Sequence, residues 1–386
     1  MPSRDRLRLL HVIHMLNPVA GGAVSAVRSM CAALADRGHE VELYATEEKG
    51  WPEEQNTSYR TRVFAMEFAP LAISSRFVSA LERLKTVDLV HIHQLYRFPQ
   101  AAAAYFCRRH RIPYCIQPHG SLAPELFHKP ERRATKRLYE MLVENRNLRH
   151  AAGIVYTAEG ERDAVDFLHL APPAFVVPNG LHLADFDTSA SGFRARHGLE
   201  GKELIAWMGR LVRVKGLDIL LKAFAPIARQ RPQTVLVLIG PDSENYSATL
   251  RQLIARLGIP PGQVLFTGML HGKEKLAALG EADLFVMPSY TENFALAAVE
   301  AMAMSRPVIV SSGVKIAPAI AQADAGLVVA PDACELAAAM TSLMGDAARR
   351  QRMGEAARLL ASHYDWQVVV AQLESAYRAM IGGASR

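Results

Sequence analysis

Short apolar runs alternate with longer stretches of helical periodicity along almost the whole chain. The runs end at Gly, Pro or clusters of polar residues, which is typical of buried β-strands. In the first half we expect strands at 7–16, 41–45, 88–94, 114–117, 153–156 and 175–177, and helices at 23–37, 99–111, 131–148 and 159–168. Strands separated by helices predict a parallel, doubly wound sheet.

The alternation stops once and then starts again. Pro178-Asn179-Gly180 interrupts it, and polar residues continue to about Glu200. The second series has expected strands at 204–208, 235–239, 264–267, 284–287, 307–311 and 327–329, with helices at 217–229, 246–257 and 273–279 before three closing helices, the last at 366–380. The sequence thus predicts an α/β protein of two Rossmann-like domains, 1–181 and 182–365. We expect them to face each other across a cleft at the carboxyl ends of both sheets.

Composition and charge exclude several other classes of protein. Half of the 386 residues are apolar and 21% are charged, so a disordered chain is excluded. Polar residues interrupt the apolar run near the N-terminus, so we expect neither a signal peptide nor a membrane span. The four cysteines lack CxxC spacing, which indicates reduced thiols in a cytoplasmic protein. The net charge is +6, and we expect no nucleic-acid partner.

The stretch 283–304 combines a strand, a loop and a helix with two carboxylates. An apolar run ends at Pro288-Ser289, a polar turn carries Glu292, and good helix formers from Phe294 onward carry Glu300. Eight residues of helix span about 12 Å, so the two carboxylates cannot act on one atom or share a metal. They can hold the two ends of an elongated ligand over the helix N-terminus, which suits a diphosphate.

The glutamates and their surroundings resemble a known family. Glu292-x7-Glu300 follows Pro288-Ser289 and precedes Pro307-Val308-Ile309, as in the retaining glycosyltransferases of family 4. The resemblance covers essentially the whole chain and implies the B-type glycosyltransferase fold. It also implies that the helix at 366–386 packs back on the first domain, which would bind the acceptor, while the second domain would bind a nucleotide sugar.

A pair of cations follows the first strand of the second domain. Gly209-Arg210 and Lys215-Gly216 lie in a segment that matches the family almost throughout. Arg offers a planar fork and Lys a point charge, and both suit a diphosphate leaving group. The resemblance implies that Arg210 and Lys215 hold this diphosphate together with backbone amides of the loop and helix start. The donor-binding residues expected there are Asn293, Phe294, Ala295 and Leu296.

The first domain offers weaker signals. Gly21-Gly22 lies between the first strand and helix, where a tight turn is the plain explanation and the family lets a ligand approach the backbone. By resemblance His119, in a Pro-His-Gly-Ser turn, faces the donor sugar together with Glu292. His91 and His93 alternate on one strand and point to one face; no third ligand appears at a suitable spacing, so we expect no metal site. Asp185-Phe186-Asp187 lies in the linker, and its likeness to an Asp-x-Asp metal motif is taken as coincidence.

The resemblance implies a retaining, metal-independent hexosyltransferase without a cofactor. It would move a sugar from a UDP- or GDP-sugar to a glycan or a lipid-linked acceptor in the biosynthesis of a cell-surface polysaccharide or exopolysaccharide. The alternatives are a nucleotide-sugar epimerase on the same fold and a non-catalytic nucleotide-sugar-binding protein. The sequence does not name the base, the sugar or the acceptor.

The segment 129–149 bears on the acceptor. It carries seven basic residues and three acids, with Leu138, Met141 and Leu142 at helical spacing. An ordinary amphipathic helix packed on the sheet is one interpretation. The other is contact with an anionic membrane at the inner face of the cell membrane, which would make the enzyme peripheral and its acceptor membrane-linked.

The chain departs from the family pattern in three places. Asn293 and Ala295 stand where the family has glycines, and the alanine adds a methyl group where backbone should meet phosphate. His182 replaces a usual Asp. The residues after the Pro307 strand lack the usual Gly-Gly-x-x-Glu. These changes concern the identity of the donor and leave the fold expectation intact.

Overall fold

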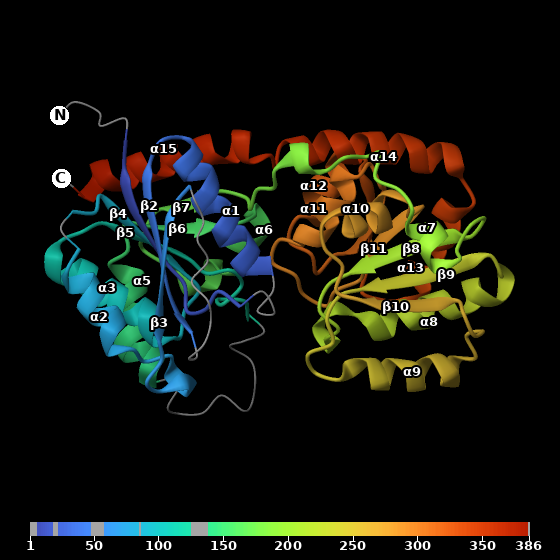
Figure 1. The fold of residues 1–386 in the computed structure, drawn as a ribbon, viewed down its shortest axis with the longest axis horizontal. Helices are drawn as coiled ribbons and strands as arrows, with labels where there is room; N and C mark the ends of the chain where they lie inside the picture. The colour runs from blue at the N-terminus through green and yellow to red at the C-terminus, as the bar shows by residue number, and fades with distance from the viewer. Residues whose placement is uncertain (1–5, 18–21, 48–57, 85, 125–137, 385–386) are drawn as a thin grey trace. The chain divides into compact units, whose positions relative to one another are not determined.

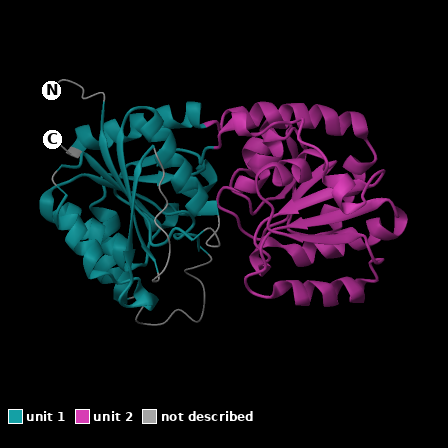
Figure 2. Cartoon of the chain, viewed as in Figure 1, with its two compact units in different colours: residues 1–180, 366–386 teal, residues 181–365 magenta. Residues whose placement is uncertain are grey.

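A computed structural model describes residues 6–17, 22–47, 58–84, 86–124 and 138–384. The chain divides into two compact units (Figure 2). The first comprises residues 1–180 and 366–386, and the second comprises residues 181–365. The division after Gly180 lies one residue before the boundary expected from the sequence.

The first unit is built on a parallel sheet of seven strands in the order β3-β2-β1-β4-β5-β6-β7 (Figure 1). The strands are β1 (Arg8–Val12), β2 (Glu40–Glu47), β3 (Arg60–Ala65), β4 (Leu89–His93), β5 (Tyr114–Gln117), β6 (Gly153–Tyr156) and β7 (Ala174–Val176). The α-helices are α1 (Gly22–Asp36), α2 (Ser75–Glu82), α3 (Phe98–His110), α5 (Asn145–Arg149) and α6 (Glu159–Ala164), and a π-helical turn at Glu140–Glu144 precedes α5. Side chains alternate along β1, so Leu9 joins the core under α1, while Leu10 joins the core under α2 and α3.

The C-terminal helix α15 (Trp366–Ala384) belongs to the first unit. Its apolar face shares a buried core with α1 and β1. Glu374 accepts two hydrogen bonds from the guanidinium of Arg37, at 2.8 and 2.9 Å, and lies 2.8 Å from Nε2 of His39. A Cβ on Gly180 would lie 2.4 Å from the ring of Trp366, so this glycine is needed for the helix to begin there.

The second unit is a parallel sheet of six strands in the order β10-β9-β8-β11-β12-β13. The strands are β8 (Glu203–Met208), β9 (Thr234–Ile239), β10 (Val264–Gly268), β11 (Leu284–Met287), β12 (Val308–Ser311) and β13 (Gly326–Val329). The helices are α7 (Phe193–His197), α8 (Leu217–Gln230), α9 (Tyr246–Leu257), α10 (Gly272–Gly280), α11 (Leu296–Ala303), α12 (Ala317–Gln322), α13 (Ala333–Met344) and α14 (Ala347–Ser362). Helices α8 and α9 cover one face of the sheet and α10 the other (Figure 1).

The segment expected as a helix over 131–148 is described only from Leu138. Its acids point inward and its apolar residues outward: Glu144 is 1% exposed, whereas Leu138, Met141 and Leu142 are 52–61% exposed. Glu144 accepts a hydrogen bond from the amide of Tyr96 at 2.9 Å, which compensates its burial. The interpretation as an amphipathic helix with these apolar residues against the sheet is therefore wrong. Among the described residues, no helix has both the length and the apolar character needed to cross a bilayer.

Candidate active site

The sheet order locates a binding site in each unit. In both sheets the chain moves outward from a central strand in one direction, then returns to its other side, which places a switch point between β1 and β4 and another between β8 and β11. Loops at the carboxyl ends of strands diverge at such a point and leave room for a ligand. The residues predicted from the sequence as donor-binding in the second unit lie at the switch point of β8 and β11.

Two loops pack closely at this switch point. Tyr290, in the loop after β11, donates a backbone hydrogen bond to Val214 in the loop after β8, at 2.9 Å. Gly216 has a φ of +70°, and a Cβ there would lie 2.0 Å from the carbonyl oxygen of Pro288. No other residue type fits this position without moving the backbone. The glycine beside Lys215 therefore allows the β8 loop to reach the β11 loop.

Lys215 and Glu292 form an ion pair across these loops. Both side chains are largely buried, at 18% and 17% exposure. The backbone of Glu292 is held as well, because its N–H donates to Gly313 and its carbonyl accepts from Lys315, each at 3.0 Å. The segment after β12, where the chain departs from the family pattern, thus positions the loop glutamate through its backbone.

Glu300 has a cation of its own. It is the fifth residue of α11, and its carboxylate lies 3.1 Å from Nζ of Lys275 on α10. Lys275 was not predicted from the sequence, because its pairing with Glu300 depends on the packing of α10 beside α11. Two lysine–glutamate pairs therefore flank the beginning of α11, one in the loops and one along the helix.

The N-terminus of α11 has no side-chain cap. Ala295 occupies the cap position, and its backbone lies in the left-handed region at φ +59° and ψ +52°. Its methyl group cannot accept a capping hydrogen bond. The first N–H groups of a helix have no partner within the helix and carry partial positive charge. Phe294, just before the cap, is buried and packs edge-on against Tyr364 at 5.4 Å between ring centroids. The helix start is thus fixed in place with its amides available to an anion.

Arg210 lies at the exit of β8 and is partly exposed. Within the described parts of the chain, its guanidinium forms no hydrogen bond or ion pair. Its neighbour Gly209 is approached closely by Gly240, whose φ is +142° and whose added Cβ would lie 1.9 Å from the Gly209 carbonyl oxygen. A partly buried guanidinium without a protein anion is suited to bind a phosphate.

Ala295 leads to a prediction about stability and donor affinity. A residue other than Gly, Asn or Asp in the left-handed region costs about 1–2 kcal/mol. A glycine at the same position loses about 0.5–1 kcal/mol more conformational entropy on folding than an alanine does. Ala295→Gly should therefore raise the free energy of unfolding by up to about 1 kcal/mol and lower the donor Kd, because its methyl group is removed from the helix start.

The matched control for that prediction is Ala298→Gly, inside the same helix. Glycine there should cost about 1 kcal/mol of helix propensity and leave the α11 N-terminus unchanged. Thermal unfolding and donor titration of both variants provide the measurement. Equal destabilisation by the two substitutions would show that the backbone at Ala295 is not strained.

The first unit presents His119 at the exit of β5. This residue has a φ of +49°, and the following amide of Gly120 donates to the carboxylate of Glu161 at 3.0 Å. The same carboxylate accepts from the backbone N–H of Thr157 at 2.7 Å, which ties the turn to the exit of β6. Burial lowers the pKa of His119 to about 4, so its ring is neutral at physiological pH. Of the predicted Gly21-Gly22 loop, Gly22 begins α1, and Gly21 lies outside the described residues.

A third histidine joins the pair on β4. The register of β1 and β4 sets His11 opposite His91, and ring nitrogens of His11, His91 and His93 all lie within 4.8 Å of one another. The sequence showed no third ligand at a suitable spacing along the chain, and the structure brings His11 to the pair from the adjacent strand. The relevant signal is a histidine at the matching position of the adjacent strand, which no spacing along the chain reveals.

The histidines give the fold a sensitivity to acid. Burial lowers the pKa of His11 to about 3 from its ordinary 6.5. Between these values the unfolded chain binds a proton that the folded chain does not. The contribution of the neutral His11 ring to the free energy of unfolding is therefore complete above about pH 6.5, and it is lost as the pH falls towards 3. At pH 5, about 1.5 pH units below the ordinary pKa, this histidine alone should lower the free energy of unfolding by about 2 kcal/mol, at 1.36 kcal/mol per pH unit.

Urea unfolding at pH 7.5 and pH 5.0 measures this loss. Between the two pH values, the free energy of unfolding of the His11→Leu variant should fall by about 2 kcal/mol less than that of the wild type. The control is His150→Leu, a substitution at an exposed histidine, which should show the pH dependence of the wild type. Equal pH dependence of the wild type and His11→Leu would contradict the argument.

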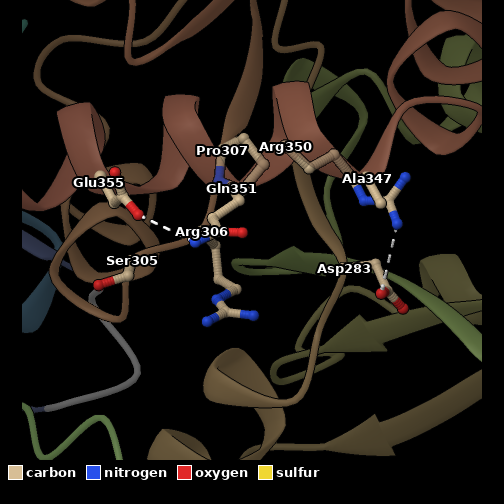
Figure 3. A pocket seen from close by; sticks show the side chains of 8 residues that line it. All are labelled: Asp283, Ser305, Arg306, Pro307, Ala347, Arg350, Gln351 and Glu355. Carbon is tan, nitrogen blue, oxygen red and sulfur yellow. Dashed lines mark hydrogen bonds and ion pairs between the residues drawn. The ribbon is translucent and has the colours of Figure 1, made fainter.

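A separate pocket lies at the other end of the second sheet, beside the amino ends of its strands (Figure 3). Its volume is about 360 Å³, and its lining residues include Asp283 just before β11 and Pro307 just before β12. Arg306, in the same lining, donates to the carbonyl oxygens of Met304 and Ala282 at 2.9 and 3.1 Å. Its guanidinium therefore closes the amino ends of the strands and takes no part in the site at their carboxyl ends.

Asp185 and Asp187 do not resemble metal ligands in their surroundings. Both are exposed, and the Asp187 carboxylate accepts hydrogen bonds from the N–H and hydroxyl of Ser189 at 2.9 and 2.7 Å. These contacts are those of a local turn.

Comparison with protein families agrees with this geometry. Residues 21–180 match the model described as "Glycosyl transferase 4-like domain", and residues 191–360 match "Glycosyl transferases group 1". The second match contains the β8, β11 and α11 residues described above. The chain belongs to the group 1 glycosyltransferases.

Relatives of this glycosyltransferase are enzymes of the same kind. It is 30% identical over 282 residues to the D-inositol 3-phosphate glycosyltransferase of Corynebacterium aurimucosum, an alignment that covers 69% of this chain and 66% of that one. The structure of sucrose-phosphate synthase from Thermosynechococcus elongatus matches with a TM-score of 0.80 at 23% identity, over 96% of this chain and 98% of the other. Anabaena Alr3699/HepE in complex with UDP-glucose matches with a TM-score of 0.76 at 20% identity, over 96% and 98%.

These likenesses confirm the predicted B-type glycosyltransferase fold. The family models and the curated relatives show that the enzyme is a nucleotide-sugar glycosyltransferase, as the sequence predicted.

Proposed function

We propose that this enzyme moves a hexose from a UDP- or GDP-sugar to an acceptor hydroxyl, with retention of the anomeric configuration and without a metal ion. The observation that carries the proposal is the arrangement around α11. An uncapped helix N-terminus lies between two lysine–glutamate pairs, with the guanidinium of Arg210 at the exit of the neighbouring strand. This sequence of charges suits a sugar, a diphosphate and a ribose in a row.

Each group has a distinct part in the proposal. Arg210, Lys215 and the amides of Phe294, Ala295 and Leu296 hold the diphosphate, whose negative charge grows as the sugar departs. Glu300 accepts hydrogen bonds from the ribose hydroxyls through the carboxylate that Lys275 orients. Glu292 contacts the donor sugar, and the family resemblance assigns a sugar contact to His119 of the first unit. Asn293 and Gly22 line the approach of the donor, as the resemblance implies for these positions.

Release of nucleoside diphosphate tests this function. UDP-glucose and GDP-mannose are each incubated with the enzyme, with and without candidate acceptors, in EDTA. We expect release of UDP or GDP that increases with the acceptor and survives EDTA. An altered sugar with the diphosphate bond intact would indicate an epimerase, and binding without any conversion would indicate a nucleotide-sugar-binding protein. Activity that EDTA abolishes and Mn²⁺ restores would contradict metal independence.

The acceptor in this proposal is a glycan or a lipid-linked saccharide at the membrane surface. Support comes from the surface formed by Leu138, Met141 and Leu142, which we call the apolar trio. Each of these side chains is more than half exposed, although each would normally be buried. Arg146 and Arg149 follow on the same helical segment and are exposed as well. Apolar side chains rimmed by arginines fit an anionic lipid surface, where each basic residue adds about 1 kcal/mol.

Vesicle co-sedimentation checks the membrane part. The enzyme should bind vesicles that contain anionic lipid and not neutral ones, and Leu142→Glu should weaken this binding at least tenfold. The matched control is Leu359→Glu, an equally exposed leucine on α14 that should leave binding unchanged. Equal binding to both kinds of vesicle, or none to either, counts against a lipid-linked acceptor and favours a small soluble one, such as the phosphorylated inositol named for the Corynebacterium relative.

A further inference from the structure

A chain of three hydrogen-bonded histidines runs through the core of the first unit and ends at His119. Nδ1 of His11 on β1 lies 3.0 Å from Nε2 of His93 on β4. Nδ1 of His93 in turn lies 3.1 Å from Nε2 of His119. His11 and His93 are 0% exposed, and their rings stack with centroids 5.3 Å apart. The two links use Nδ1 of His11, both nitrogens of His93 and Nε2 of His119. The atom at the outer end of this chain of histidines is Nδ1 of His119.

All three rings are neutral, because burial lowers the pKa of each well below 6.5. A neutral imidazole has one N–H and one lone pair. Each of the two hydrogen bonds must therefore contain one proton, and the direction chosen for one bond sets the direction of the other. Only two arrangements are consistent: all three rings carry hydrogen on Nδ1, or all three carry it on Nε2.

The far end of the chain decides between them. Nε2 of His11 is buried and has no hydrogen-bond partner among the described residues. With hydrogen on Nε2 throughout, this atom would be a buried donor without an acceptor. With hydrogen on Nδ1 throughout, it is a lone pair without a donor. Among backbone groups, buried donors left unpaired are rarer than unpaired acceptors, and we apply the same preference to the imidazole N–H. The chain therefore carries hydrogen on Nδ1, and His119 presents an N–H at the exit of β5.

We propose that His11 and His93 are positioning residues that lock His119 in its Nδ1–H tautomer, so that it donates a hydrogen bond to a hydroxyl of the donor sugar. The part that concerns the sugar rests on the proposed function of this enzyme. The tautomer itself follows from the contacts in the first unit alone. No hydrogen-bond partner of His119 Nδ1 is found among the described residues, and the side chain is partly exposed, so the N–H is available to a ligand.

A metal ion is the rival occupant of this cluster. Ring nitrogens of His11, His91 and His93 are close enough to bind one. Three neutral imidazoles can hold Zn²⁺, so the ligand types alone do not decide between an ion and the hydrogen bonds. Both ring nitrogens of His93 lie within hydrogen-bond distance of another histidine, so an ion bound to His93 would break one of these two links. The contacts favour the hydrogen-bonded chain.

The tautomer is measured directly by long-range ¹H–¹⁵N correlation on the full-length enzyme labelled with ¹⁵N-histidine, with the His119 signals assigned from the spectrum of His119→Gln. Without any donor present, Nδ1 of His119 should be protonated and Nε2 should not. A protonated Nε2 in the wild type overturns the proposal, and this result needs no folded variant of the cluster. Metal analysis of the same sample completes the measurement, because stoichiometric Zn²⁺ would also overturn it.

Variants then test whether the chain acts through His119. His11→Leu removes the first donor and should allow the Nε2–H tautomer of His119 to appear, while His11→Asn retains an N–H near the position of Nδ1 and should restore the wild-type spectrum. His91→Leu is the matched control, since His91 is equally buried on β4 but bonds to Tyr377 at 2.6 Å. It should leave the His119 signals unchanged. A His119 spectrum that is the same in His11→Leu and wild type contradicts the positioning role.

Kinetics separate this inference from the proposed function. One neutral hydrogen bond corresponds to about 2- to 12-fold in affinity, so His11→Leu should raise the donor KM within that range and His11→Asn should not. The expected tautomer with no change in KM on His119→Ala would leave the chain intact and refute the contact with the sugar. The opposite tautomer with full glycosyl transfer would refute the chain and leave the proposed function standing.

Discussion

Lys215→Ala should lower kcat by about 10²-fold or more, the typical loss when one group that stabilises transition-state charge is removed. In the structure Lys215 lies in the loop after β8, at the switch point of the second sheet, and its side chain is 18% exposed. A charge in so dry a position acts on a departing diphosphate with little screening by solvent. Its effect should therefore appear in kcat and not only in KM.

The variant does not disturb the rest of the site in an obvious way. Glu292 loses its ion-pair partner, but its backbone remains bonded to Gly313 and Lys315. Lys222→Ala is a suitable control, because Lys222 is an exposed lysine on the following helix, 3.8 Å from Asp218. Steady-state rates of nucleoside diphosphate release provide the measurement. A kcat within threefold of wild type for Lys215→Ala would refute its role at the leaving group.

Glu300→Gln should raise the donor KM by roughly 10- to 150-fold with little change in kcat, whereas Glu292→Gln should lower kcat. Glu300 lies more than one turn inside α11, beyond a sugar held over the helix N-terminus. It is placed to meet the ribose, which does not change during transfer, so its contact is uniform binding. Loss of a charged hydrogen bond of about 1.5–3 kcal/mol gives the stated range.

Glu292 differs because it lies in the loop that carries the reacting end. It also holds Lys215, so neutralising it should affect the charge that meets the diphosphate. Both substitutions keep size and shape, which makes them a matched pair. Lys275→Met adds a control for the ion pair of Glu300, since it removes the lysine and keeps the carboxylate, and it should raise KM less than Glu300→Gln does. A loss of kcat in Glu300→Gln together with a loss of affinity alone in Glu292→Gln would reverse the orientation proposed for the donor.

Elements with clear apolar periodicity and clear boundary signals were predictable from the sequence. The expected helix at 246–257 agrees at both ends with α9, and the expected strand at 235–239 agrees with β9 to within one residue. Their apolar runs and flanking Gly, Pro and polar residues reflect local physics that the fold does not alter. The glutamates, Lys215 and His119 were recognised for a similar reason. Lys215, Glu292 and His119 lie in loops that follow strand ends, whereas Glu300 lies on α11 and was singled out by its spacing from Glu292.

Elements at the edges of the sheets were harder to predict. Strand β3, at one edge of its sheet, begins Arg-Thr-Arg and has only three apolar residues, so it was not expected from the pattern. Helices α2, α7 and α12 are short and were not expected either. The segment after Leu138 was misread because helical spacing shows that one face differs from the other, but not which face is inside. There the burial of Glu144 is decided by the amide of Tyr96, which lies 48 positions away in the chain.

The sequence by itself thus determined the two α/β units, their strand–helix order and the residue types available at the strand ends. Only the tertiary structure decided which of these residues are partners. Lys275 pairs with Glu300 because α10 lies beside α11, and His11 reaches His93 because β1 pairs with β4 in one particular register. Periodicity is a property of neighbours along the chain. A pairing across strands or helices depends instead on the register and packing of the whole sheet, which no local pattern contains.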